Sequence, residues 1–164
     1  SAKHQFFYSH QLIQNCKMSL KEIRNQILND HNECRYQHRA MPLRLDVGLN
    51  GTAQYHADNL AEDDGGLYHS GSDHGENIYA CTSGFHPTDV TNSWYSEAPT
   101  YNYAAGGFSR SVGHFTAMVW RATSQLGVGI AQSRSGKVFV VAHYSPTGNV
   151  AGQYTQNVLP PQSR

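Results

Sequence analysis

The chain has 164 residues, and its 12 Lys and Arg balance its 12 Asp and Glu, so the formal net charge is zero with histidine neutral. This length suits one domain with a sizeable core. The zero charge argues against a general electrostatic attraction to nucleic acid. No apolar stretch of the sequence is long enough to span a bilayer.

Cysteine is sparse, and the chain contains Cys16, Cys34 and Cys81 alone. An odd, small number does not build a disulfide framework, and a domain of this size does not need one. We therefore expect three reduced thiols in a reducing compartment. One disulfide with one free thiol is the alternative.

The chain divides into an N-terminal arm, residues 1–18, and a single domain, residues 19–164. Ser19 and Glu22 have the spacing of a capping box, in which each side chain accepts a backbone amide of the other residue. This cap predicts a helix that continues to about His38, before Pro42. Inward positions recur along it at three- and four-residue steps: Leu20, Ile23, Ile27, His31 and Cys34.

Two further helices are predicted before the C-terminal third of the chain. Residues 49–62 have the helical period, with these residues inward: Leu49, Ala53, Ala57 and Leu60. Residues 87–98 form the other helix, with Val90 and Trp94 on its inner face.

The segments between these helices are predicted as loops. Residues 63–73 are rich in Gly, Ser and Asp and carry His69, and residues 75–80 are predicted as a helical turn. Residues 99–112 are rich in Gly, Ala and Tyr and form a long surface loop. Loops of this length in a compact domain are often functional.

The C-terminal third changes to the period of strands. Residues 126–132 and 138–144 predict two strands, and Gly136 lies in the turn of an antiparallel hairpin. The second run is apolar on both faces, which predicts a covered central strand. Because helices come first and strands last, the fold class is α+β.

Residues 113–120, GHFTAMVW, place His114 behind a glycine and at the head of an apolar run. Such a run fixes a segment in the core, so a histidine at its edge can face a cavity in a defined position. His69, Glu76 and Glu97 lie in three further segments that combine His or Glu with Gly, Ser, Asn or aromatic residues. Together the four side chains supply two imidazoles and two carboxylates.

The other histidines divide into surface and structural positions. His31 is expected to be a hydrogen-bonded core residue, His74 to hydrogen-bond a loop, and His143 to be structural within a strand. The remainder are expected at the surface or in the solvated arm: His4, His10, His38, His56 and His86.

Four segments in matching order resemble the motifs of the CAP superfamily of cysteine-rich secretory, antigen 5 and pathogenesis-related proteins. They are residues 31–35 (HNECR), 74–77 (HGEN), 113–120 (GHFTAMVW) and 143–149 (HYSPTGN). The resemblance covers residues 20–161. It implies a three-layer α-β-α sandwich with a mainly antiparallel central sheet, in a binding protein and not an enzyme.

The departures from the family pattern point to one branch. Where secreted members usually carry framework cysteines, this chain has Val112, Val128 and Ala142. That pattern is similar to the Golgi-associated pathogenesis-related branch. The resemblance implies an intracellular protein, peripheral to Golgi or other endomembranes, that acts with lipids or protein partners and forms a homodimer. A secreted immune-modulating protein is the alternative.

The resemblance also implies that His69, Glu76, Glu97 and His114 converge in the family's central cavity. These residue types suit zinc or a similar divalent ion. The carboxylates can also serve as the acceptors that fix each imidazole's tautomer, with Ser70 and Asn77 as further polar neighbours.

Two alternatives to a metal-binding site stay open. The four side chains can form a hydrogen-bonded cluster without metal, since buried polar groups must be paired. They can also form the site of a metal-dependent protease or esterase, with His69 and His114 as ligands and Glu76 or Glu97 as base.

Tyr101, Tyr103 and Phe108 have the spacing of a caveolin-binding pattern, which in some family members lies in a sterol-binding loop. We therefore predict that these three residues bind lipid, because rigid aromatic rings can cover a flat apolar ligand. The alternative is that they fold back onto Trp94 and Trp120 as a satellite core.

A second route to membranes is contact with anionic lipids through basic residues of the first helical region. These are Lys17, Lys21, Arg24, Arg35, Arg39 and Arg44. A solvated helix face explains them equally well.

Overall fold

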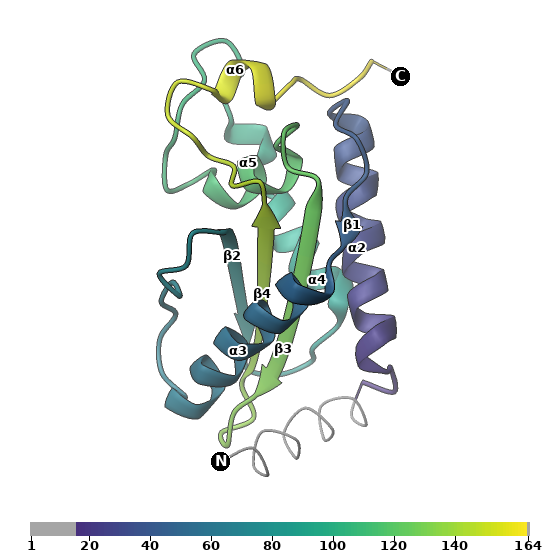
Figure 1. The fold of residues 1–164 in the computed structure, drawn as a ribbon, viewed down its shortest axis with the longest axis vertical. Coiled ribbons are helices and arrows are strands. Elements are labelled where there is room, and N and C mark those ends of the chain that lie inside the picture. Colours follow the sequence, from purple (N-terminus) through teal and green to yellow (C-terminus); the bar gives the residue numbers. More distant parts are fainter. Residues whose placement is uncertain (1–15, 164) are drawn as a thin grey trace.

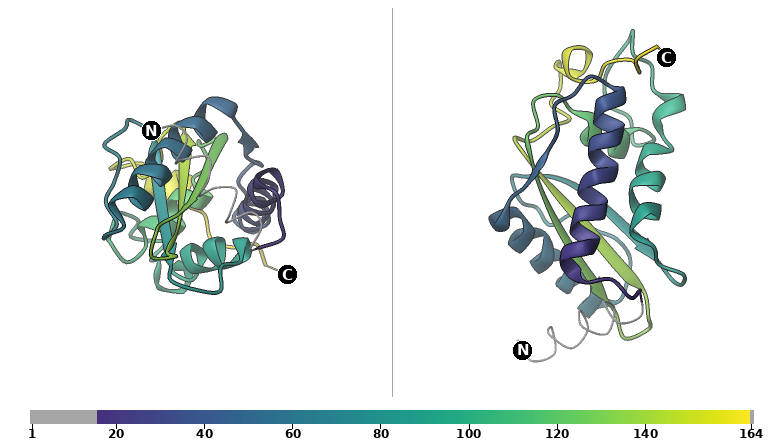
Figure 2. Two further views of the ribbon diagram at one scale, coloured as in Figure 1. Left: turned by 90° about the horizontal axis from the view of Figure 1, so that it is seen from below. Right: turned by 90° about the vertical axis from the view of Figure 1, so that its right-hand side faces the viewer.

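The computed structural model describes residues 16–163 (Figure 1). His4, His10 and most of the predicted arm lie outside these residues. A central sheet separates helix α3, Val47–Asp63, on one face from helix α2, Leu20–Gln37, on the other, as the views in Figure 2 show. The predicted three-layer α-β-α sandwich is confirmed.

The sheet of the described chain has the strand order β1-β3-β4-β2. These strands are β1 (Arg44–Leu45), β2 (Gly75–Cys81), β3 (Gln125–Gln132) and β4 (Val138–Ser145). Only the β1–β3 pair is parallel, so the sheet is mainly antiparallel. The predicted hairpin is therefore confirmed as β3 and β4, and the predicted covered central strand as β4.

The prediction of a helical turn at residues 75–80 is wrong, because this segment is strand β2. Each of its residues pairs with one in β4, from Gly75 opposite Tyr144 to Cys81 opposite Val138. Fifty-six residues, 82–137, separate the two strands in sequence, so no local pattern indicated the partner.

Strand β4 buries both faces, and the two faces contribute to different cores. Phe139 and Val141 pack with Ala57 and Leu60 of α3. The alternate residues face the other layer, which contains α2, α4 (Pro87–Tyr95) and α5 (Gly113–Val119): Val138, Val140, Ala142 and Tyr144. This period of two is the expected geometry of a strand between two layers.

Helix α2 begins where its capping box predicts. The amide of Ser19 donates to Oε2 of Glu22 at 2.6 Å, and the amide of Glu22 donates to Oγ of Ser19 at 3.1 Å. Ile23, Ile27 and His31 are buried along its inner face. His31 is thus a core residue, as predicted.

The other helices differ from the predictions at their ends. Helix α3 begins two residues early because Asp46 caps it, with Oδ1 2.8 Å from the amide nitrogen of Leu49. Helix α4 ends at Tyr95, and a short 3-10 helix, η1 (Ala98–Thr100), follows it. A further short helix, α6 (Tyr154–Asn157), was not predicted.

Strand β1 has only two residues, so side chains of α3 form hydrogen bonds with backbone groups farther along the outer edge of β3. Asn50 accepts the amide of Val128 at 2.9 Å. Gln54 accepts the amide of Ile130 at 3.1 Å and donates to its carbonyl at 2.8 Å. An unpaired edge strand would otherwise leave these backbone groups without partners.

Arg35 is fully buried, so it does not belong to the basic surface predicted for this region. Its guanidinium donates to four carbonyls, those of Met41, Met118, Trp120 and Thr123, at 2.8 to 3.0 Å. Burial lowers the pKa of Arg35 to about 10. The side chain therefore joins the end of α2 to the end of α5 as a cation solvated by backbone oxygens.

Two histidines predicted at the surface are buried. Nδ1 of His38 lies 2.7 Å from the carbonyl oxygen of Leu159, and its Nε2 lies 2.8 Å from Tyr95 Oη. Nε2 of His56 donates to the carbonyl of Tyr68 at 2.7 Å. Both predictions were wrong because long-range packing, which periodicity does not show, covers the two rings. His86 is exposed, as predicted.

Gly129 is required by the close approach of α3 to β3. A Cβ at this position would lie 2.3 Å from the backbone nitrogen of Gln54. We expect Gly129→Ala to lower the free energy of unfolding by about 1–3 kcal/mol or more, because α3 must move away from the sheet. Urea unfolding measures this change.

The matched control is Gly51→Ala on the exposed side of α3, where an added Cβ meets no atom within 4 Å. Since alanine favours the helix, this variant should gain about 0.5–1 kcal/mol. Equal effects of the two substitutions would contradict the close approach.

Candidate functional site

His69 and Glu76 form the first of two imidazole–carboxylate pairs. His69 lies in the loop before β2, and Glu76 is the second residue of β2. Nδ1 of His69 is 2.7 Å from Oε1 of Glu76, and the amide of Ser70 donates to the same oxygen at 2.9 Å. The side chain of His69 is 71% exposed and that of Glu76 only 6%, so a buried carboxylate holds a surface ring.

The second oxygen of Glu76 is held from the neighbouring strand. Oε2 lies 2.6 Å from Nε2 of His143, which is directly opposite in the β2–β4 register. His143 is buried, and its Nδ1 lies 2.8 Å from Thr52 Oγ1 of α3. Burial alone would raise the pKa of Glu76, but hydrogen bonds from His143, Ser70 and His69 outweigh it and lower that pKa to about 2. Glu76 is therefore an anion that only accepts hydrogen bonds.

His114 and Glu97 form the second pair. His114 is the second residue of α5, and its Nδ1 is 3.1 Å from Oε2 of Glu97. The other oxygen of Glu97 accepts the amide of Phe115 at 2.9 Å, which satisfies a free donor at the start of α5. The ring of His114 stacks on the indole of Trp94, with centroids 6.2 Å apart and planes 11° apart.

A buried network fixes the backbone at His114. Asn77 donates to the carbonyl of His114 at 3.0 Å and to Tyr144 Oη at 3.1 Å. Nε2 of His31 lies 2.8 Å from the same hydroxyl, and its Nδ1 lies 2.8 Å from the carbonyl oxygen of Ile27. Because Nδ1 must donate to a carbonyl, Nε2 accepts from Tyr144. Burial lowers the pKa of His31 to about 4, so the ring is neutral at physiological pH.

The structure thus brings the four predicted metal-site residues together as two pairs. Among residues 16–163, no group of three or more His, Cys, Asp or Glu side chains is arranged to hold a metal ion. In both pairs Nδ1 faces the carboxylate, and within the described chain no hydrogen bond uses Nε2 of His69 or His114. A carboxylate on Nδ1 with an open Nε2 is the usual arrangement of a metal-binding imidazole. In both pairs the carboxylate therefore orients the ring through Nδ1 and leaves Nε2 open.

Three residues around the pairs were not predicted from the sequence. The sequence predicts a structural role within a strand for His143, and it indicates no role at the site for Thr52 or Trp94. The signal that reveals His143 is the strand register, which places it opposite Glu76, but the segment containing Glu76 was predicted as helical. Ser70 and Asn77 were predicted as polar neighbours, and both make hydrogen bonds at the site.

The serines beside the site do not contact its imidazoles. Ser70 Oγ donates to Ser72 Oγ at 3.1 Å, and Ser96 Oγ donates to the carbonyl of Ser93 at 2.6 Å. A serine hydrolase would need one of these hydroxyls within hydrogen-bond reach of a base.

The aromatic loop, residues 101–108, is divided between core and surface. Tyr101 is buried against Phe115, with ring centroids 5.8 Å apart, and Tyr103 stacks on His38 at 6.2 Å. Phe108 is 62% exposed. Tyr101 and Tyr103 also pack edge to face on each other, with ring centroids 4.9 Å apart. They thus form a satellite core, although it lies against Phe115 and His38. Phe108 is the member of the predicted lipid-binding set that is open to solvent.

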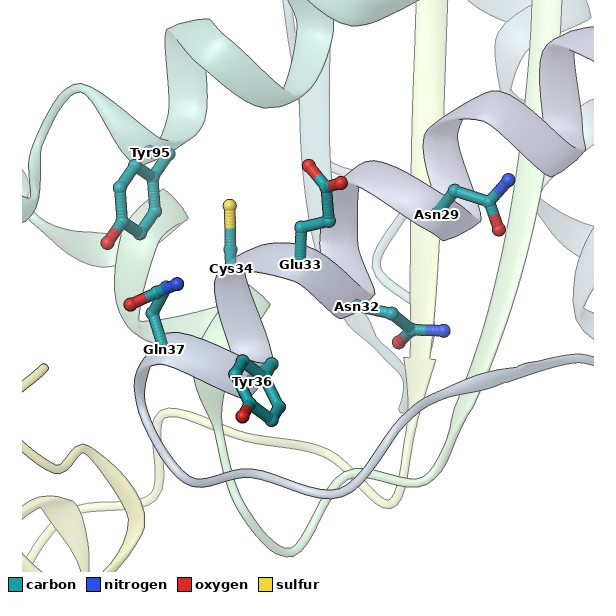
Figure 3. Close-up of a pocket in the computed structure, with 7 residues that line it drawn as sticks. All are labelled: Asn29, Asn32, Glu33, Cys34, Tyr36, Gln37 and Tyr95. Atoms are coloured by element: carbon teal, nitrogen blue, oxygen red, sulfur yellow. The ribbon is translucent and has the colours of Figure 1, made fainter. Parts of the chain in front are cut away.

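A separate groove of about 900 Å³ runs between α2 and the end of α4 (Figure 3). It is lined by Asn29, Asn32, Glu33, Cys34, Tyr36, Gln37 and Tyr95. Burial, with Asp30 and Glu33 nearby, raises the pKa of Cys34 to about 12, so its thiol stays protonated and unreactive. The amide of Asn32 is occupied by the backbone of Leu43. The groove therefore carries no activated group.

Solved structures share this three-layer sandwich. BmVAL-1 superposes with a TM-score of 0.70 at 23% identity over 85% of this chain and 84% of that one. A structure of NaASP2 with Zn2+ gives a TM-score of 0.63 at 23% identity over 85% and 86%. These likenesses show a shared fold.

The chain belongs to the cysteine-rich secretory protein family, the CAP family, whose model matches residues 28–144. It is 41% identical over 152 residues to the human Golgi-associated plant pathogenesis-related protein 1, covering 89% of this chain and 98% of that protein. It is 37% identical over 127 residues to the tomato (Solanum lycopersicum) pathogenesis-related leaf protein 4, covering 75% and 77%. The resemblance recognised in the motifs is confirmed.

The lowered pKa of Glu76 predicts an acid-dependent loss of stability. Below about pH 4.5 the unfolded carboxyl takes up a proton that the folded one resists until about pH 2, so the free energy of unfolding falls across this window. Glu76→Gln should remove that part of the pH dependence and cost about 1–3 kcal/mol at neutral pH.

Urea unfolding from pH 7 to pH 2 measures both effects. The control is Glu62→Gln, which changes an exposed carboxylate at the end of α3. If native protein and Glu76→Gln lose stability in parallel below pH 4.5, the hydrogen bonds to Glu76 do not stabilise the fold.

Proposed function

We propose that the protein is a binding protein, and not an enzyme, that acts at membrane surfaces and binds a divalent ion, zinc foremost, through His69 and His114. The observation that carries the metal proposal is the shared orientation of the two rings. Each directs Nδ1 to a carboxylate and leaves Nε2 for a ligand. The NaASP2 structure with Zn2+ has the same fold, which supports zinc as the first ion to test.

The zinc would act as a Lewis acid and supply a fixed positive charge at the two imidazoles. Zinc sites in proteins commonly have four ligands, so two imidazoles leave positions for water or for a donor of a bound molecule. The protein fixes the tautomer and the orientation of the rings: Glu76 and Glu97 hold the protons on Nδ1, and Trp94 covers one face of His114.

The membrane part of the proposal rests on the exposed Phe108 and on the similarity to a Golgi-associated protein. No helix of residues 16–163 is long and apolar enough to cross a bilayer. We propose an intracellular protein that attaches peripherally to Golgi or other endomembranes through lipid or sterol, with Tyr101, Tyr103 and Phe108 in the contacting loop. Pairing of two chains into a homodimer is part of the same proposal.

Zinc affinity should depend on both histidines. Isothermal calorimetry near neutral pH should show at least a tenfold loss in His69→Ala and in His114→Ala, because each substitution removes one of two imidazole ligands. Affinity should also fall below about pH 6, where protons compete with the metal for imidazole nitrogen.

His86→Asn is the matched control, since His86 is exposed, caps α4 and belongs to neither pair. Unchanged affinity in either alanine variant would place the metal elsewhere. Zinc-dependent turnover of peptide or ester substrates that is lost in Glu76→Gln would replace the proposal with a hydrolase.

Membrane binding should depend on Phe108 separately from folding. In flotation with liposomes of anionic lipid and sterol, Phe108→Ala should reduce the bound fraction severalfold, with stability changed by less than about 0.5 kcal/mol, because the ring is exposed. Tyr101→Ala should instead cost about 3–5 kcal/mol of stability, because it leaves a cavity beside Phe115.

The zinc-site variant His69→Ala serves as the control with an intact aromatic loop. Flotation of Phe108→Ala equal to that of the native protein would show that the loop does not carry the lipid contact.

A further inference from the structure

The two imidazole–carboxylate pairs are anchored in different ways. Both carboxylates accept a backbone amide, that of Phe115 at Glu97 and that of Ser70 at Glu76, but His114 is in addition stacked on Trp94. His69 is 71% exposed, and within the described chain its one hydrogen bond goes to Glu76. The position of His69 therefore depends on how firmly Glu76 is held.

Glu76 is held by a ring that itself has little freedom. Oε2 of Glu76 lies 2.6 Å from Nε2 of His143, whose side chain is 1% exposed. Because Nε2 faces an anion, it must carry a proton. The β2–β4 register sets the two residues opposite each other, so the contact does not rely on a loop.

Helix α3 fixes the other side of the His143 ring. Thr52 Oγ1 lies 2.8 Å from Nδ1 of His143 and 3.1 Å from the carbonyl oxygen of Leu49 one turn earlier. The ring of His74 lies 5.5 Å away, tilted by 40°. Thr52, His143 and Glu76 thus form a continuous chain of hydrogen bonds from α3 through the sheet to the exposed His69.

We propose that His143, oriented by Thr52, is a positioning residue that holds Glu76 and through it His69 in the geometry for metal binding. The inference rests on the proposed zinc function in one respect only, namely the measurement of zinc affinity. The positioning itself is a property of the metal-free protein. His143 does not touch the ion, so its effect must pass through Glu76.

Two measurements on the full chain test the proposal. The first is hydrogen exchange of the Ser70 amide, which donates to the same Glu76 oxygen as His69, with the Phe115 amide on Glu97 as internal reference. The second is zinc affinity by calorimetry. The variants are His143→Phe, which keeps a ring without hydrogen bonds, and His143→Gln, which keeps an N–H donor.

The chain of hydrogen bonds from Thr52 through His143 to Glu76, here called the relay, predicts a pattern that general destabilisation of the fold would not give. In His143→Phe, exchange at Ser70 should accelerate at least tenfold relative to Phe115, and zinc affinity should fall about 10- to 100-fold, as for other groups that orient metal ligands. His143→Gln should restore most of both. Thr52→Val should reproduce the Ser70 effect at smaller size, whereas Thr52→Ser should match the native protein.

The two variants Thr52→Val and Thr52→Ser still test the proposal if His143→Phe fails to fold. Native exchange at Ser70 in Thr52→Val or His143→Phe would overturn the proposal, as would equal acceleration at Ser70 and Phe115. If the native protein binds no zinc, the proposed function fails, and the exchange pattern alone decides whether His143 positions Glu76.

Discussion

The antiparallel pairing of β2 with β4 is the constraint from which the site follows. Successive strand residues point to opposite faces, so Glu76 faces the α3 side while Asn77 faces the α2 side. Glu76 forms hydrogen bonds with His143 and with His69. Asn77 donates hydrogen bonds to the hydroxyl of Tyr144 and to the backbone carbonyl of His114. A single strand thus positions both imidazoles from two sides of the sheet.

The first family motif, residues 31–35, builds the framework behind that strand. His31 accepts a hydrogen bond from the Tyr144 hydroxyl, and Asn32 pairs with the backbone of Leu43. Arg35 binds the carbonyl of Met41 after α2 and three carbonyls at and just after the end of α5. Burying such groups is costly unless every polar atom has a partner, and here each finds one. His31, Asn32 and Arg35 therefore act through hydrogen bonds that hold the core together.

Local signals in the sequence predicted much of the fold. The capping box at Ser19, the run in β4 that is apolar on both faces and the turn at Gly136 depend on neighbouring residues, and all were predicted correctly. The identity of β2 and the burial of His38 depend on partners far away in sequence, and these predictions were wrong. The same holds at the site: its four His and Glu residues were found from motifs, whereas the relay through Thr52 and His143 needed the strand register.

The central claim is that Glu76 and Glu97 hold His69 and His114 with the proton on Nδ1 and the lone pair on Nε2. Long-range ¹⁵N–¹H correlation spectra of the metal-free protein above pH 7.5 report the tautomer of each ring directly. The account predicts the Nδ1–H tautomer for both histidines, and loss of that preference at His69 alone in Glu76→Gln. A predominant Nε2–H tautomer at either ring in the native protein would contradict the account.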